Sequence, residues 1–181
     1  MRDLRPARHA PLLATTPGVR PLPAAARWIL RGGPQVRLAA EGALKLAVPA
    51  VACRAAADGE SAALWLGPDE WLLISAGHRA EETAAALGAA LAGLAHSLVD
   101  VSHRQIALEV TGPDAPVLLA AGCPLDLEAA AFPVGMCTRT LLAKAEVVLW
   151  RTGPETFRVE VWRSFAPYVS AFLAEAARGL A

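Results

Sequence analysis

The sequence predicts an α+β domain, and a repeated local pattern is the reason. Twice along the chain, two short apolar strand signals are joined by a Gly-Pro turn and followed by an amphipathic helix pattern. The two turns begin 86 residues apart, at Gly67 and Gly153. Strand pairs that alternate with helices give a mainly antiparallel sheet with packed helices. The similar units indicate an internal duplication, although Gly-Pro turns also recur by chance.

The first unit runs from a strand at 62–66 to a helix at about 79–94. The strand and its return at 71–74 are apolar and bounded by turn residues. Leucines repeat at helical spacing through the last segment and predict the helix. The turn and the start of the returning strand contain Gly67, Pro68, Asp69 and Trp71.

The second unit has a strand at 146–151, a turn at 153–156 and a returning strand at 157–162. A helix follows, for which Ser164 is the expected N-cap, because a Ser side chain accepts a hydrogen bond from the first helical turn. Its apolar face consists of Phe165, Val169, Phe172, Leu173 and Ala176. Both units are therefore expected to have the same order of elements.

Between the units, the sequence predicts strands near 97–101 and at 104–111. A short helix follows, which Pro113 starts and Gly122 ends. We expect one α+β domain over residues 25–181, with a sheet that has helices packed on one face.

Residues 1–24 are expected to form a flexible arm rich in Pro and Arg. The segment holds five prolines, and its arginines include Arg2, Arg5 and Arg8. Proline blocks both helix and sheet hydrogen bonding. No continuous apolar stretch marks a signal peptide or a membrane span. Two interpretations remain open: a disordered terminus, and an arm that becomes ordered on a partner.

Composition narrows the classes of function. The chain has 181 residues, of which 55% are hydrophobic, and a formal net charge of zero. It can bury its own core and has no excess charge to attract nucleic acid. Cys53, Cys123 and Cys137 are odd in number and widely spaced, which indicates reduced thiols in a cytoplasmic protein. Zinc-site spacing and Gly-rich nucleotide motifs are both missing, so we expect no metal or dinucleotide site.

Residues 99–104, with the sequence Val-Asp-Val-Ser-His-Arg, contain the three residue types of a serine hydrolase. Side chains alternate along a strand, so Asp100 and Ser102 would share one face and His103 would project from the other. A catalytic triad needs all three at one point. We therefore expect a partly buried His103 that fixes a turn, and a structural pair between Asp100 and Arg104.

Several short motifs together resemble one family. They lie, in this order, at residues 66–72 (Leu-Gly-Pro-Asp-Glu-Trp-Leu), 100–104 (Asp-Val-Ser-His-Arg), 122–127 (Gly-Cys-Pro-Leu-Asp-Leu), 132–135 with 137–140, and 163–166 (Arg-Ser-Phe-Ala). Each motif alone is weak. Their order and spacing, over about residues 60–178, resemble the gamma subunit of heterotetrameric sarcosine oxidase.

The resemblance implies a fold similar to the folate-binding domain of aminomethyltransferases and a non-catalytic role in assembly. In that family the bacterial complex oxidatively demethylates sarcosine to glycine and passes the methylene group to tetrahydrofolate on another subunit. FAD, FMN, NAD, tetrahydrofolate and zinc are accordingly expected on other subunits, with no catalytic residue or cofactor on this chain. The implied partners are the alpha, beta and delta subunits, with alpha in direct contact.

A partner surface is expected at the end of the last strand. In the strand at 157–162, the apolar side chains share one face. Trp162 therefore lies on the opposite face, with Arg158 and Glu160. Trp and Arg are enriched at binding hot spots, so the expected interface residues are Trp162, Arg163, Arg104 and Arg139. The alternative is that the N-terminal arm or a neighbouring loop covers Trp162.

Two further alternatives concern chemistry on the chain itself. Cys137 lies near Arg139, whose positive charge would activate a thiol, but free cysteines are mostly buried and inert. The competing function is a free-standing folate-binding or aminomethyltransferase-like protein, which would bind tetrahydrofolate in isolation.

Overall fold

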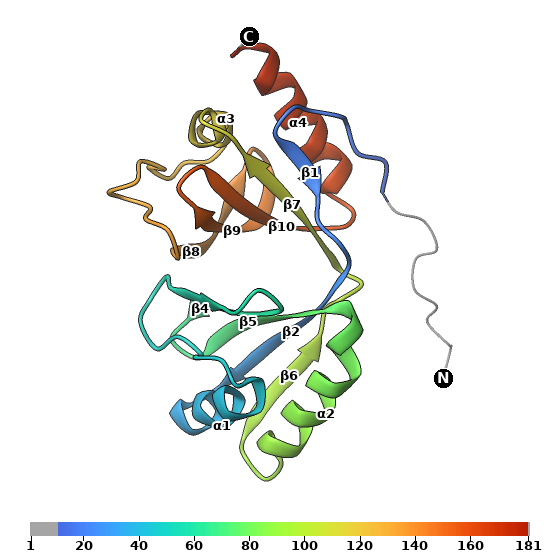
Figure 1. The fold of residues 1–181 in the computed structure, drawn as a ribbon, viewed down its shortest axis with the longest axis vertical. Helices are drawn as coiled ribbons and strands as arrows, with labels where there is room; N and C mark the ends of the chain where they lie inside the picture. The colour runs from blue at the N-terminus through green and yellow to red at the C-terminus, as the bar shows by residue number, and fades with distance from the viewer. Residues whose placement is uncertain (1–10, 181) are drawn as a thin grey trace.

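A computed structural model describes residues 11–180, and two five-stranded sheets dominate it (Figure 1). The first sheet has the order β3-β4-β5-β2-β6 and the second has the order β1-β7-β10-β9-β8. Every strand pair in both sheets is antiparallel, as the sequence predicted. We expected one sheet; the structure has two, because each hairpin-plus-helix unit forms its own.

The first half of the molecule runs from β2 to β6. Its helices α1 and α2 contact each other and pack on the first sheet. A single turn of 3-10 helix, Gly77–Arg79, leads into α2. The elements are β2 (Ala25–Gly32), α1 (Pro34–Leu44), β3 (Ala55–Ala57), β4 (Ser61–Gly67), β5 (Glu70–Ala76), α2 (Ala80–Leu91) and β6 (His96–Asp100).

The second half runs from β7 to α4 and includes one strand from the start of the chain. Its helices α3 and α4 pack on the second sheet. The elements are β1 (Val19–Pro21), β7 (Gln105–Thr111), α3 (Ala115–Ala120), β8 (Cys137–Leu142), β9 (Ala145–Gly153), β10 (Thr156–Trp162) and α4 (Ala166–Arg178).

The two halves have equivalent strand orders. If the second sheet is read from its other edge, β8-β9-β10-β7-β1 matches β3-β4-β5-β2-β6 position by position. The first half is a β-α-β-β-α-β unit with one additional edge strand, a topology of the ferredoxin-like type, and the second half has the same arrangement in space with β1 from the start of the chain as its last strand. The two similar hairpin-plus-helix units predicted from the sequence are thus confirmed as β4-β5-α2 and β9-β10-α4.

Strand β1 lies inside the segment that we expected to be a flexible arm. Residues 1–10 of that segment lie outside the described residues, but Val19 is paired with Val110 of β7, and Pro21 with Leu108. A proline is tolerated there because β1 is an edge strand, whose outer side needs no N–H. The sheet of the second half therefore begins before residue 25.

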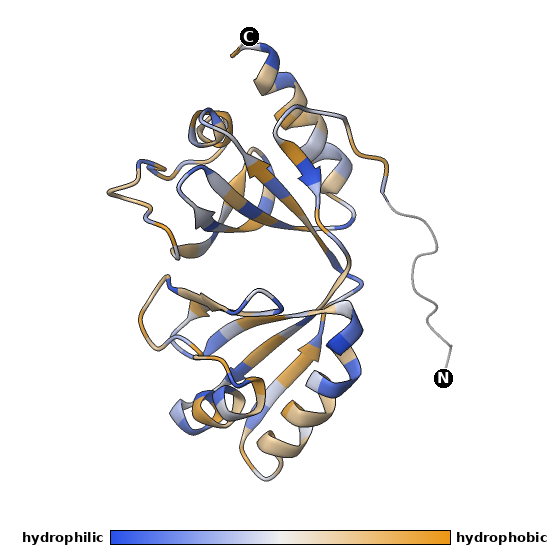
Figure 2. Ribbon diagram, viewed as in Figure 1, coloured by the Kyte–Doolittle hydropathy of each residue, from blue (hydrophilic) through white to orange (hydrophobic). Residues whose placement is uncertain are grey.

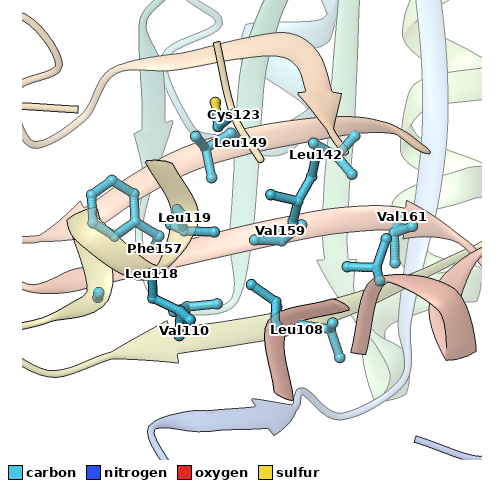
Figure 3. Close-up of a cluster of buried hydrophobic side chains, with 14 of the residues drawn as sticks. Leu108, Val110, Leu118, Leu119, Cys123, Leu142, Leu149, Phe157, Val159 and Val161 are labelled. Carbon is cyan, nitrogen blue, oxygen red and sulfur yellow. The ribbon is translucent and has the colours of Figure 1, made fainter. Parts of the chain in front are cut away.

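Three apolar clusters hold the layers together. One joins α1 and α2 to the first sheet, and another joins α3 and α4 to the second. Side chains of β7, β8, β9, β10 and α3 converge in the latter (Figure 3). The third cluster lies between the sheets and includes Leu64, Leu72, Cys137 and Val148. Apolar and polar residues alternate along several strands, consistent with packing on each face (Figure 2).

Two local predictions need correction. The N-cap of α4 is Phe165, not Ser164, and no side chain caps the helix. Phe165 is 42% exposed and does not belong to the buried face of α4. The sequence also gave no prediction for β2 and α1. No helix within residues 11–180 has both the length and the apolar character needed to cross a membrane.

Candidate subunit interface

The segment that resembled a triad is the crossing between the two halves. Strand β6 ends at Asp100, so Ser102 and His103 lie in a turn, and the argument from strand alternation does not apply to them. The Asp100 carboxylate accepts a hydrogen bond from the Ser102 N–H at 2.8 Å, and Ser102 Oγ accepts one from the Arg27 N–H at 2.9 Å. His103 is exposed rather than partly buried. These contacts fix the turn, as expected for a structural segment.

Arg104 pairs with an aromatic ring instead of with Asp100. Its guanidinium carbon lies 5.1 Å from the centre of the Trp162 ring, within the range of a cation–π contact. No ion pair between Asp100 and Arg104 occurs among the described residues. The turn therefore brings two of the predicted interface residues together.

The face of β10 that carries Trp162 is not the solvent face that the sequence suggested. Glu160 on that face is fully buried and accepts a hydrogen bond from Arg27 Nε at 2.6 Å. Arg158 also pairs with Glu160, at 2.7 Å. The polar face of β10 thus packs against the first sheet, because Arg27 of β2 supplies a buried counter-charge. Trp162, at the end of the strand, is 39% exposed, whereas the Arg158 side chain is 17% exposed.

Trp162 is one of four exposed apolar side chains at the end of the second sheet where β8 and β10 end and α4 begins. We call these four residues, Trp162, Phe165, Tyr168 and Leu141, the aromatic rim. The Tyr168 hydroxyl accepts a hydrogen bond from the N–H of Lys144 at 3.3 Å, which links α4 to the β8–β9 turn. Aromatic side chains combine a large apolar area with low conformational entropy, so such a group suits a protein interface.

Three of the four predicted interface residues border one small crevice beside the aromatic rim. Arg104, Arg139 and Trp162 line it together with Glu146, and its volume of about 10 Å³ leaves little room for a ligand. Arg163, the fourth, is half-buried and donates from its Nε to the His103 carbonyl at 3.3 Å.

Arg139 also connects the two halves through Glu70. The Glu70 carboxylate accepts hydrogen bonds from Arg139 Nη2 at 2.6 Å and from Arg31 Nε at 3.2 Å. Burial alone would raise the pKa of Glu70, but the hydrogen bonds from Arg139 and Arg31 outweigh it and hold the pKa below its ordinary value. The same contact raises the pKa of Arg31. Glu70 is therefore an ionised bridge between β5 and β8.

The signature residues around the first hairpin have structural contacts. Gly67 pairs with Glu70 across the turn, and the Asp69 carbonyl accepts a hydrogen bond from the Gly32 N–H at 3.0 Å. Pro68 is exposed at the tip. Trp71 is buried, and its indole N–H donates to the Pro49 carbonyl at 2.7 Å. These residues fix the hairpin and the loop after α1.

Cys137 has the features of an inert thiol. It is fully buried, and burial raises its pKa to about 12. Arg139 pairs with Glu70 and Glu146 instead of with the sulfur. Within residues 11–180, no three His, Cys, Asp or Glu side chains gather in a group that would hold a metal ion.

Sequence reasoning missed two features of this region. Tyr168 was not considered, although it lies three residues after Phe165 and therefore on the same side of α4. A cavity of about 820 Å³ was also missed; it lies where the segments 21–26 and 100–107 cross between the halves, next to the start of α2. No local sequence pattern marks such a cavity, because segments distant in the chain form it.

Comparison with known proteins agrees with the resemblance. The model of the sarcosine oxidase gamma subunit family matches residues 32–179. Sarcosine oxidase subunit gamma of Corynebacterium sp. (strain P-1) is 40% identical over 116 residues, which are 64% of this chain and 56% of the relative. The chain thus spans about half the length of the curated relatives it matches.

Two solved structures extend the comparison. A chain of heterotetrameric sarcosine oxidase from Corynebacterium sp. U-96, in complex with pyrrole 2-carboxylate, is 31% identical with a TM-score of 0.84; the match covers 89% of this chain and 83% of that one. Aminomethyltransferase T of the glycine cleavage system from Bartonella henselae is 14% identical with a TM-score of 0.67, over 89% of this chain and 48% of that one. The second likeness confirms the predicted fold alone. With its family model matched across residues 32–179, the chain belongs to the sarcosine oxidase gamma subunit family.

Proposed function

We propose that this chain is the non-catalytic assembly subunit of a heterotetrameric sarcosine oxidase. The observation that carries the proposal is the structural match, over 89% of the chain, to a subunit of such an enzyme. In the proposed complex, sarcosine is oxidatively demethylated to glycine and the methylene group passes to tetrahydrofolate on another subunit. The flavins, NAD, tetrahydrofolate and zinc accordingly belong to the other subunits.

The aromatic rim is the proposed contact with a partner subunit, and the alpha subunit is the proposed partner. The Arg104 guanidinium lies over the Trp162 ring, and Trp and Arg are among the residue types most enriched at hot spots. Burial of a partly exposed Trp in an interface supplies more binding free energy than burial of a smaller side chain. The alternative that the N-terminal segment covers Trp162 is not supported for residues 11–180, in which Trp162 keeps 39% exposure.

Replacement of Trp162 tests this role. Trp162→Ala is expected to weaken assembly by about 2 kcal/mol, the usual cost of truncating a hot spot. The measurement is co-purification of tagged alpha, beta and delta subunits with the variant. Leu38→Ala is the matched control, because Leu38 is a 55% exposed apolar residue on α1, away from the aromatic rim. Equal recovery of both variants would remove Trp162 as an anchor.

Folate binding by the chain alone is the competing function, and calorimetry separates the two. Titration of the isolated chain with a reduced folate is expected to give no binding heat. A saturable heat would contradict the assembly role and support a free-standing folate-binding protein.

A further inference from the structure

Strand β6 presents an open sheet edge. Val101 donates its N–H to the Arg27 carbonyl at 2.9 Å, which sets the phase of the ladder between β6 and β2. In an antiparallel pair, alternate residues point their N–H and C=O groups away from the neighbour. The outward groups belong to His96, Leu98 and Asp100, and their N–H groups have no hydrogen-bond partner within residues 11–180.

The equivalent edge in the second half is closed. Strand β1 occupies the position of β6, and its outward residues are Val19 and Pro21. The Val19 N–H donates to the Thr16 carbonyl at 3.1 Å, and Pro21 has no N–H. Natural proteins block exposed edges with prolines, lysines or bulges, and β6 has no proline or lysine.

The opposite edges of the two sheets are engaged with each other. The Ala55 N–H of β3 donates to the Gly135 carbonyl at 2.8 Å, and the Cys137 N–H of β8 donates to the Cys53 carbonyl at 3.0 Å. Within residues 11–180, β6 makes no backbone hydrogen bond to the second half. It also exposes an apolar side chain, since Val99 is 51% exposed.

A cavity lies next to the C-terminal end of β6. Asp100 lines the 820 Å³ cavity together with Ala80 and Ala84 of α2 and the Pro-rich segment 21–25. The volume lies within the range of about 300–1,000 Å³ that ligand pockets occupy. Two carboxylates at this cavity, Asp100 and Glu81, form no ion pair within the described residues. Of the two guanidinium groups at the cavity, that of Arg27 is paired with Glu160, which leaves two carboxylates beside the single guanidinium of Arg163. The cavity therefore combines small apolar walls with an excess of negative charge.

From the open edge and the cavity together, we propose that an extended segment of a partner subunit adds to β6 as a sixth strand of the first sheet and continues into the cavity. The main-chain groups of His96, Leu98 and Asp100 bind the segment, an apolar residue covers Val99, and a basic side chain faces Asp100 and Glu81. Strand addition of this kind takes affinity from backbone hydrogen bonds and specificity from alternate side chains. The inference rests on the proposed function and names a contact separate from the aromatic rim.

Hydrogen exchange on the assembled complex tests the proposal. The backbone N–H groups of Leu98 and Asp100 are expected to exchange about tenfold more slowly, or slower still, in the complex of all four subunits than in the isolated chain. If the complex assembles and these two N–H groups exchange at unchanged rates, the inference fails and the assembly function stands. If no complex forms at all, the proposed function fails.

A charge placed on the edge gives a second measurement. Val99→Lys is expected to weaken assembly about tenfold, because a lysine on an edge strand opposes strand addition. Val117→Lys is the matched control, since Val117 is 55% exposed on α3, away from β6. Both variants keep a buried core intact, so an assembly loss confined to Val99→Lys supports the proposal. Equal assembly of the two variants would overturn it.

Two other possible occupants of the β6 edge would give different hydrogen-exchange results. Pairing with a second copy of the chain would protect Leu98 and Asp100 in the isolated protein at high concentration, without partner subunits. Occupation by residues 1–10, which are basic, would protect them at any concentration and would be lost in a variant that lacks those residues. Either result overturns strand addition by a partner.

Discussion

The two halves of the molecule share one strand order, yet they obtain their last strand in different ways. In the first half, β6 follows α2 directly along the chain, whereas β1 of the second half comes from the opposite end of the sequence. The second half has a closed edge at β1 and the first half has an open edge at β6. Two units of the same topology can therefore differ at one edge, which is blocked in the second half and open in the first, where we propose that a partner strand binds.

Two ion-pair contacts join the halves, and they differ in burial. Arg27 of the first half reaches Glu160 of the second in the interior, where the two side chains are 2% and 0% exposed. Arg139 of the second half reaches Glu70 of the first nearer the surface. The predictions below separate these contacts by their expected effect on the free energy of unfolding.

The largest effect is expected from the buried pair. Glu160→Gln leaves the Arg27 guanidinium without a counter-charge in the interior, which costs about 3–5 kcal/mol. Chemical denaturation followed by far-UV circular dichroism measures the loss. The double variant Arg27→Met with Glu160→Leu should recover part of it, because the buried Arg27 charge is removed with its partner and only Arg158, which is 17% exposed, loses its counter-charge. A single variant as stable as the wild type would show that the pair does not hold the halves together.

A smaller effect on the free energy of unfolding is expected from glycine-to-alanine substitutions, one in each half. A Cβ on Gly122 would lie 2.6 Å from Phe172 Cζ and 2.9 Å from the Ala143 nitrogen. Gly122→Ala should therefore destabilise the second half by about 1–3 kcal/mol through overpacking. Gly88→Ala in α2 is the control; nothing lies within 4 Å of its Cβ position, and stability should rise by about 0.5–1 kcal/mol. Loss of stability in both variants would contradict the packing explanation.

The smallest effect concerns Glu70 and depends on pH. The folded-state pKa of Glu70 is lowered, so its contribution is present above the unfolded pKa, about 4.3, and is lost as pH falls through the folded value. Glu70→Gln should cost about 1 kcal/mol at pH 7, and the difference from wild type should shrink below pH 4. Thermal unfolding at pH 7 and at pH 3 measures both values. A difference that grows in acid would have the wrong sign for an ionised bridge.

The sequence predicted the parts of the fold that depend on local pattern. The hairpins at β4-β5 and β9-β10 have apolar strands and Gly-Pro turns, and each was expected within a few residues of its observed position. Strand β1 was not predicted, because three residues that include a proline form a strand only through pairing with β7. Strand β2 was missed as well; its buried Arg27 reads as a surface residue unless Glu160 is known to lie opposite.

The sequence predicted only part of the candidate interface. Trp162 and Arg104 were both expected there, and the structure brings them into contact. Alternation correctly grouped Trp162 with Arg158 and Glu160 on one face of β10, but it does not show what covers that face, and the first sheet covers it. Phe165 and Tyr168 join Trp162 through the position of the α4 N-terminus, which the sequence placed one residue too early.

The origin of β1 at the start of the chain has a consequence for connectivity. Residues 15–18 before β1 and residues 174–180 at the end of α4 border one cavity of about 600 Å³, so the segment that leads into β1 lies beside the end of α4. A circular permutant cut at Pro23 and joined from residue 180 to residue 15 would encode each half as one uninterrupted stretch. In the natural order, β1 precedes the whole first half, and Val19 pairs with Val110, 91 residues later in the chain, so pairing of β1 requires the first half to lie between the two strands.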